Sequence, residues 1–279
     1  MSETCTHDCS TCGANCSSRE AEPMLKPANP KSRVKKVIGV VSGKGGVGKS
    51  LVSSLLAVAT QRAGFKSAVM DADITGPSIP KAFGVHDKAL GQDDGVFPAE
   101  TKKGTKIISI NMFLEDESDP VVWRGPVIAG MVTQFWTEVM WGDVDFMFVD
   151  MPPGTGDVPL TVFQSLPVDG VVVVTSPQEL VGQIVEKCVR MAEMMNVPVL
   201  GLVENMSYFV CPDCGEKHEI FGASHAAEAA QAHGIDTVCR IPMDSRLAAN
   251  MDAGEIEEFE GDWLQPLVGK LAGLLKTDK

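Results

Sequence analysis

The sequence is poor in the features that mark secreted, membrane-spanning and nucleic-acid-binding proteins. No apolar run reaches the roughly 18 residues that a membrane span needs, and the first residues show neither a signal peptide's apolar core nor an Arg-rich transit segment. Basic residues are in deficit, with 24 Lys and Arg against 37 Asp and Glu, and no basic stripe carries interleaved aromatics. A formal net charge of -13 repels a phosphate backbone. We expect a cytoplasmic protein with neither membrane nor nucleic acid as a partner.

Internal repeats and low-complexity tracts are also absent, so one main domain is expected. A chain of 279 residues with 44% hydrophobic content can bury the core of one α/β domain. Residues 1–33 carry four cysteines and then Pro23, Pro27 and Pro30, a composition that buries little apolar surface. We interpret 1–33 as a flexible Cys-rich tail and linker, and 34–279 as the folded domain.

Short β-branched runs alternate with longer helical stretches from residue 34 onwards. Strands are predicted over 37–41, 67–70, 107–112, 146–149, 171–175, 199–203 and 237–241. Helices are predicted over 51–63, 126–140, 178–195, 224–233 and 263–276. The strands are apolar on both faces, as in a sheet covered by helices on each side. The fold class is therefore α/β, a doubly wound and mostly parallel sheet.

A phosphate-binding loop lies between the first predicted strand and the first helix. It reads Gly43-Lys44-Gly45-Gly46-Val47-Gly48-Lys49-Ser50. Glycines let backbone N–H groups converge on phosphate oxygens at a helix N-terminus, Lys49 neutralises the β and γ oxygens, and Ser50 can ligate Mg²⁺. We predict an ATP site here that extends to Leu51.

A second lysine, Lys44, stands inside this loop, and the variant resembles the deviant Walker A ATPases. That superfamily includes MinD, ParA and the nitrogenase iron protein. The resemblance implies a P-loop NTPase fold of the MinD type, with Lys44 reaching the phosphates of a partner subunit. It also implies that ATP promotes closure of a homodimer.

Two carboxylates follow predicted strands, where doubly wound sheets bind their ligands. Asp73 ends Asp71-Ala72-Asp73, and Asp150 follows the strand at 146–149. Phosphoryl transfer to water requires a positioned water and neutralised charge. We assign Asp73 to the water and Asp150, with Ser50, to Mg²⁺, which makes Lys44, Lys49 and Asp73 the catalytic residues of an ATPase.

The pair Cys211 and Cys214 has the spacing that directs two thiolates at one metal or cluster. Two ligands are too few for a zinc ion or a four-iron cluster, and nearby only His218 could add one. Closure by the same two cysteines of a second subunit is the economical solution, which again predicts a homodimer. Spacing alone leaves a cluster, a structural zinc and a redox dithiol open.

The tail presents a complete ligand set of its own, and two other cysteines lie in apolar surroundings. Cys5, Cys9, Cys12 and Cys16 fall within twelve residues, a set that suits iron-sulfur or zinc. Cys188 and Cys239 are interpreted as small buried hydrophobes.

Several segments resemble the Mrp/ApbC family of iron-sulfur carrier ATPases. They are Asp71 to Pro80, Val122 to Pro126, Asp150 to Asp157, Glu204 to Val210 and Ile241 to Asp244. The resemblance implies that Asn205 and Pro242 contact adenine and that Cys211 and Cys214 hold a bridging [4Fe-4S] cluster. The tail cysteines resemble the amino-terminal cluster motifs of longer relatives, although their spacing differs. We assign Cys5, Cys9, Cys12 and Cys16 to an iron-sulfur group, with zinc and no physiological metal as the alternatives.

The predicted function is an ATP-dependent scaffold or carrier that builds a [4Fe-4S] cluster and transfers it to apo iron-sulfur proteins. One alternative is a MinD/ParA-type positioning ATPase with a structural zinc knuckle, for which the apolar segment at 263–276 would be a membrane helix. Electron donation in the manner of the nitrogenase iron protein ranks lower, because its cluster cysteines lie far apart in sequence.

Overall fold

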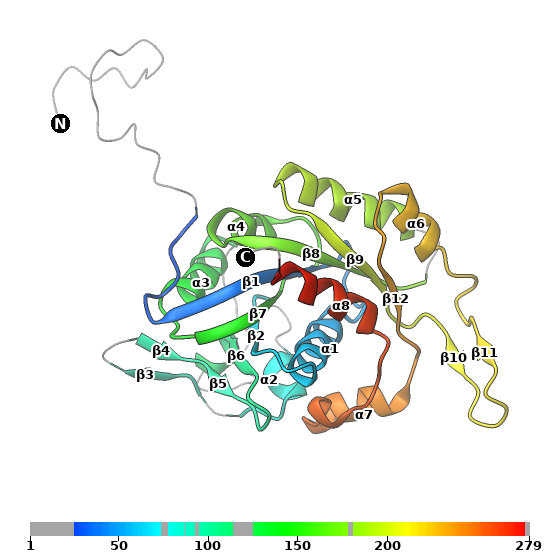
Figure 1. Ribbon diagram of the computed structural model, residues 1–279, viewed down its shortest axis with the longest axis horizontal. Helices are drawn as coiled ribbons and strands as arrows, with labels where there is room; N and C mark the ends of the chain where they lie inside the picture. Colours follow the sequence, from blue (N-terminus) through cyan, green and yellow to red (C-terminus); the bar gives the residue numbers. More distant parts are fainter. Residues whose placement is uncertain are drawn as a thin grey trace, which may run out of the picture.

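The computed structural model describes residues 25–73, 78–86, 88–92, 95–113, 125–177 and 181–276. Within them, eight strands form one sheet in the order β12-β9-β8-β1-β7-β2-β6-β5, in which only β5 and β6 pair antiparallel (Figure 1). These strands are β1 (Ser32–Val41), β2 (Ser67–Asp71), β5 (Ala99–Glu100), β6 (Lys106–Ser109), β7 (Gly142–Asp150), β8 (Val168–Thr175), β9 (Val199–Glu204) and β12 (Val238–Arg240). The predicted doubly wound fold is confirmed.

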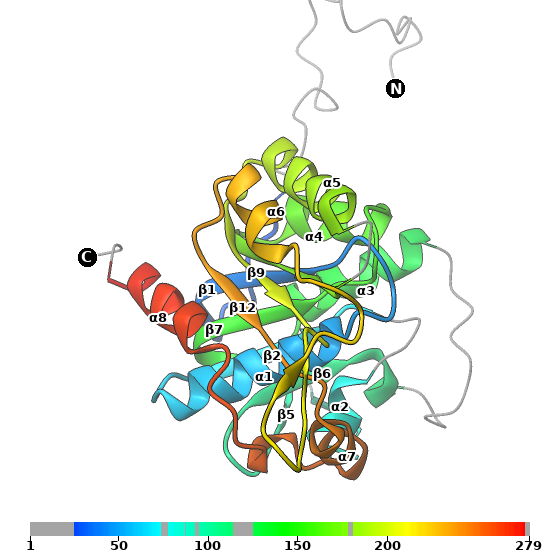
Figure 2. The same cartoon turned by 90° about the vertical axis from the view of Figure 1, so that its right-hand side faces the viewer.

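Helices cover both faces of this sheet, as the two views show (Figures 1 and 2). Helices α1 (Lys49–Arg62) and α8 (Gln265–Leu274) lie on one face. The opposite face carries α3 (Gly125–Thr137), α4 (Asp157–Ser165), α5 (Val181–Met194) and α6 (Ala226–Ala232). The central strands are buried because each is apolar on both sides, for example Val171 to Val174 in β8.

Several short elements were not predicted from the sequence. They are the edge strand β5, the helices α2 (Ile79–Ala82) and α7 (Ser245–Ala253), the 3-10 segments η2 (Ile110–Phe113) and η3 (Ile256–Glu258), and the hairpins β3 (Leu90–Gln92) with β4 (Gly95–Phe97) and β10 (Phe209–Val210) with β11 (Lys217–His218). Helix α4 was missed as well. The strand predicted over 107–112 ends at Ser109 and continues as η2.

The first strand begins earlier than predicted, and the chain before it packs on α3. The Trp136 indole N–H donates to the Lys26 carbonyl at 2.9 Å, and the Asn29 amide donates to the Glu138 carbonyl at 3.1 Å. The predicted division between 33 and 34 therefore falls inside β1, whereas the tail cysteines Cys5, Cys9, Cys12 and Cys16 lie outside the described residues.

Helix α8 buries its apolar side in the domain. Leu267, Val268 and Leu271 belong to the core, where the helix packs on β9, β12 and α1. A membrane-binding helix would need that apolar face to contact lipid, whereas in α8 the face is buried against the protein core. Among the described helices, none has the length and apolar character required to cross a bilayer.

Candidate functional site

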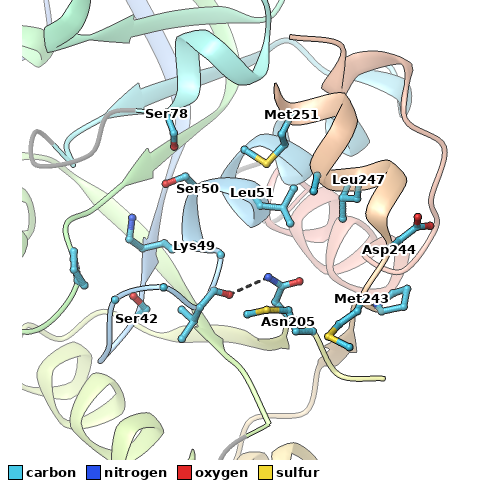
Figure 3. A pocket seen from close by; sticks show the side chains of 18 of the residues that line it. Ser42, Lys49, Ser50, Leu51, Ser78, Asn205, Met243, Asp244, Leu247 and Met251 are labelled. Atoms are coloured by element: carbon cyan, nitrogen blue, oxygen red, sulfur yellow. Dashed lines mark hydrogen bonds between the residues drawn. The ribbon is translucent and has the colours of Figure 1, made fainter. Parts of the chain in front are cut away.

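The loop between β1 and α1 forms one wall of a cavity of about 740 Å³. Gly46 and Gly48 adopt left-handed φ values of 78° and 82°, which side chains rarely tolerate. Space is also tight at Gly48, where an added Cβ would stand 2.1 Å from the Asn205 amide nitrogen. That amide donates to the Val47 carbonyl at 3.0 Å, so Asn205 supports the loop from β9's exit (Figure 3).

Acidic and hydroxyl groups gather around Lys49 at the base of this cavity. The Lys49 ammonium lies 2.8 Å from Asp150 and 3.5 Å from Asp73. The fully buried Asp150 carboxylate also accepts hydrogen bonds from Ser50 at 2.6 Å and Ser53 at 2.9 Å. Asp150 is thus held by three donors from one turn of α1.

Asp71 stands beside Asp150 because the two residues are register partners on β2 and β7. Its side chain is buried and accepts from the Ser109 hydroxyl at 3.1 Å. Burial raises the pKa of Asp71 well above its usual value, and the neighbouring Asp150 carboxylate raises it further. Asp71 was not among the site residues predicted from the sequence, which contained it only as part of the cluster Asp71-Ala72-Asp73.

The cavity has a polar half and an apolar half (Figure 3). Ser42, Lys49, Ser50 and Ser78 line the first. The buried Ser42 hydroxyl has no hydrogen-bond partner among the residues that the structure describes. The second is lined by Leu51, Phe209, Pro242, Met243, Leu247, Ala248 and Met251.

Most predicted loop residues line this cavity, whereas Gly43 and Lys44 do not. Gly45 to Leu51, Asp73, Asn205 and Pro242 are lining residues. Gly43 instead faces α5, where an added Cβ would meet Ile184 at 2.8 Å. Lys44 is exposed at the loop's outer surface.

Apart from Leu51 and Pro242, the residues of the cavity's apolar half were not predicted from the sequence. Leu247, Ala248 and Met251 come from α7, which begins after Asp244 and ends at Gly254 with φ 75°. An Asp cap and a left-handed Gly are recognised helix boundaries, so this helix could have been found. Phe209 carries no comparable signal.

Cys211 and Cys214 occupy the turn of the β10–β11 hairpin, which projects from the sheet's edge (Figure 1). Cys211 is half-buried and Cys214 is exposed. The backbone N–H groups of Cys214 and Asp213 lower the pKa of the Cys211 thiol, which favours the thiolate that metals bind. The structure also brings His218 to this pair: its ring nitrogen and the two sulfurs lie within 4.8 Å of one another.

The buried cysteines differ from this pair. Burial raises the pKa of Cys188 to about 11 and raises that of Cys239 as well. Both side chains lie in the core, as predicted. A protonated, inaccessible thiol is a poor metal ligand.

A short segment joins the cavity to the hairpin. Asn205 supports the loop, Phe209 lines the cavity's apolar half, and Cys211 follows two residues later. Between them lies Tyr208, whose ring carries Lys217 at 4.7 Å and Arg240 at 5.5 Å from its centroid. A hydrogen bond links this segment to the residues that follow β12, since the Met243 N–H donates to the Tyr208 carbonyl at 2.7 Å.

Comparison with solved structures finds one similar nucleotide-binding protein and more distant proteins of the same fold. A nucleotide-binding protein from Archaeoglobus fulgidus, solved in complex with ADP, is 44% identical and aligns with a TM-score of 0.76 over 83% of this chain and 91% of its own. The cell-division ATPase MinD of Pyrococcus furiosus aligns with a TM-score of 0.58 over 88% of this chain and 99% of its own, but at 19% identity. The second likeness shows the fold alone.

Sequence comparison identifies further relatives of similar identity. The iron-sulfur cluster carrier protein of Methanocaldococcus jannaschii is 42% identical over 90% of this chain and 89% of its own length. The protein of that name in Clostridium perfringens is 42% identical over 81% of this chain and 82% of its own. The sequence profile of the ParA/NUBPL iron-transfer P-loop NTPases matches residues 33–265. The predicted resemblance is confirmed, and the chain belongs to the NUBPL iron-transfer P-loop NTPase family.

Proposed function

We propose that this protein is an ATP-hydrolysing carrier that assembles a [4Fe-4S] cluster in the reducing cytoplasm and delivers it to apo iron-sulfur proteins. The observation that carries the proposal is the segment from Asn205 to Cys211, which belongs both to the loop-lined cavity and to the cysteine hairpin. The names of the relatives from Methanocaldococcus jannaschii and Clostridium perfringens support the same function.

The cavity fits ATP as a substrate. Its volume of about 740 Å³ lies within the usual range for ligand pockets. Lys49 and the backbone N–H groups around Gly46 and Gly48 would hold the phosphates. Ser42, whose buried hydroxyl has no partner among the described residues, lines the same half of the cavity. The apolar half suits the adenine ring, with Asn205 and Pro242 beside it.

The oxygen donors beside Lys49 fit Mg²⁺, which prefers hard oxygen ligands. Ser50 Oγ and the Asp150 carboxylate are adjacent, and we propose that they hold the ion directly or through its water shell. The ion would neutralise phosphate charge during hydrolysis. Asp73, 3.5 Å from the Lys49 ammonium, is proposed to orient the attacking water.

The active form is proposed to be a homodimer. Lys44 is exposed and outside its own cavity's lining, which suits contact with the phosphates of a second subunit. Cys211 and Cys214 supply two of the ligands that a four-iron cluster needs, and the same pair from the partner supplies the others. Cys5, Cys9, Cys12 and Cys16 are proposed to hold a second metal group, either iron-sulfur or zinc.

Anaerobic reconstitution with iron and sulfide, followed by absorption and Mössbauer spectroscopy, tests cluster binding. Transfer is then measured by activation of an apo-enzyme that requires a [4Fe-4S] cluster, with and without ATP. Asp73→Asn should abolish ATP hydrolysis yet retain the cluster, whereas Cys211→Ser with Cys214→Ser should lose the hairpin cluster yet retain nucleotide binding.

Cys239→Ala is the matched control, because it removes a thiol that the structure places in the core. It should keep both activities. The proposal would be wrong if the reconstituted wild-type protein bound zinc alone, or if its cluster never reached the apo-enzyme.

A further inference from the structure

The cysteine hairpin orders three metal-binding side chains within one subunit. Phe209 pairs with His218 and Val210 with Lys217, and the Cys211 N–H donates to the Glu216 carbonyl at 2.9 Å. Side chains alternate along a strand, so Phe209 and Cys211 lie on one face of the ribbon, and His218 shares that face through its pairing. The hairpin register therefore sets His218 beside the cysteines.

The turn brings the second cysteine to the same place. Gly215 has φ 74°, and its N–H donates to the Cys211 carbonyl at 2.8 Å, which curls the chain back on itself. The Cys211 and Cys214 sulfurs and one His218 nitrogen consequently lie within 4.8 Å of one another.

This spacing is close to that of ligands around a single ion. Tetrahedral zinc holds sulfur at about 2.3 Å and nitrogen at about 2.0 Å, which separates two ligands by roughly 3.5 to 4 Å. A four-iron cluster holds its cysteine sulfurs on different iron atoms and so places them farther apart. A contraction of about 1 Å would let one ion bind all three groups.

The stem next to His218 is anchored on both sides. Lys217 lies over the Tyr208 ring, and the Glu219 carboxylate accepts from the Arg240 guanidinium at 2.6 Å. Arg240 itself stacks on the same ring from strand β12. These contacts fix the backbone that carries His218, which reduces the entropy lost when an ion is bound.

We propose that Cys211, Cys214 and His218 of one subunit form an exchangeable site for a single borderline-soft divalent ion, such as Zn²⁺ or Co²⁺. Two thiolates and an imidazole are the donor types that such ions select, and three protein ligands leave a fourth position for water or another donor. The site shares its cysteines with the proposed bridging cluster, but it needs no second subunit. Ion binding and cluster binding therefore compete for the hairpin.

Cobalt titration of the full-length chain tests this site, with Cys5, Cys9, Cys12 and Cys16 replaced by serine so that the hairpin thiols alone report. Co²⁺ is added anaerobically, thiolate charge-transfer and ligand-field bands are recorded, and sedimentation velocity gives the oligomeric state of the same sample. We expect one Co²⁺ per chain, at a stoichiometry independent of dimer content.

His218→Ala should weaken Co²⁺ binding at least about tenfold, since even loss of a ligand's supporting partner costs that much. His225→Ala is the matched control, because His225 is an exposed histidine that contacts Glu228. His218→Cys should restore one ion per chain with stronger charge-transfer absorption from a third thiolate.

One Co²⁺ per two chains, bound equally well by wild type and His218→Ala, would overturn the inference in favour of a site with four cysteines from two subunits. Failure of the hairpin to bind Co²⁺ would overturn it as well. Neither result depends on cluster transfer to an apo-enzyme. Failure of the proposed carrier function can therefore be distinguished from failure of the single-ion site.

Discussion

Substitution of Gly48 by alanine tests whether the contact between the phosphate loop and Asn205 stabilises the fold. At φ 82°, a left-handed backbone costs an L-residue about 1–2 kcal/mol. The added methyl would also stand 2.1 Å from the Asn205 amide nitrogen and must displace it. Displacement breaks the 3.0 Å hydrogen bond to Val47 and leaves buried polar groups unpaired, about 1–3 kcal/mol more.

Gly46→Ala is the matched control for this experiment. Gly46 has a similar φ of 78°, but an added Cβ there meets nothing within 4 Å. It should therefore cost the backbone strain alone, about 1–2 kcal/mol. Urea denaturation of the nucleotide-free proteins gives both free energies of unfolding, and Gly48→Ala should lose about 1–3 kcal/mol more than Gly46→Ala.

A double-mutant cycle sharpens the test. If Asn205→Ala removes the group that the new methyl strikes, the double variant with Gly48→Ala should lose about 1 kcal/mol less than the sum of the single losses. Equal destabilisation by Gly46→Ala and Gly48→Ala, together with additive behaviour in the cycle, would refute the reasoning.

Three further substitutions test other parts of the site. Lys49→Ala should abolish ATP turnover while the hairpin keeps its metal. Urea denaturation should show that the free energy of unfolding falls by about 3 kcal/mol, because buried Asp150 loses its cation. Loss of the metal as well would indicate misfolding. Phe209→Ala should weaken ADP binding roughly tenfold in calorimetry, since it lines the cavity, whereas its neighbour Val210→Ala should not; equal effects would contradict this. The pKa of Asp71 is raised above its usual value of 3.8 in the folded protein. At pH values between 3.8 and the raised pKa, the folded state therefore binds more protons than the unfolded state, and the free energy of unfolding should fall as the pH rises through this range. Asp71→Asn should reduce that fall in denaturation curves recorded at pH values rising from 3.8, and an unchanged dependence of stability on pH would contradict the raised pKa.

The polar half of the cavity was predictable because most of its residues are close together in the sequence. The backbone N–H groups, Lys49 and Ser50 come from one short loop and the first turn of α1 that follows it, and the loop's glycines are needed for left-handed backbone and close approach. The strand-end position of Asp150 was predictable too, since parallel strands end at one edge.

The apolar half could not be derived in the same way. Phe209, Met243 and Met251 come from a hairpin, a loop and a short helix, and each looks like an ordinary core residue in sequence. Only the sheet order, which places the exits of β9 and β12 beside the loop, brings them together. The nearness of His218 to the cysteines likewise depends on a two-residue register that no pattern specifies.

Tyr208 is the one tyrosine in the chain. In sequence it lies between Asn205, which supports the loop before α1, and the cysteine turn. Lys217 of β11 and Arg240 of β12 both lie against its ring. Biosynthetic incorporation of 3-fluorotyrosine would therefore place a single ¹⁹F nucleus at this junction. Its NMR resonance would show directly whether nucleotide binding in the cavity and metal binding at the cysteine hairpin each change the surroundings of Tyr208.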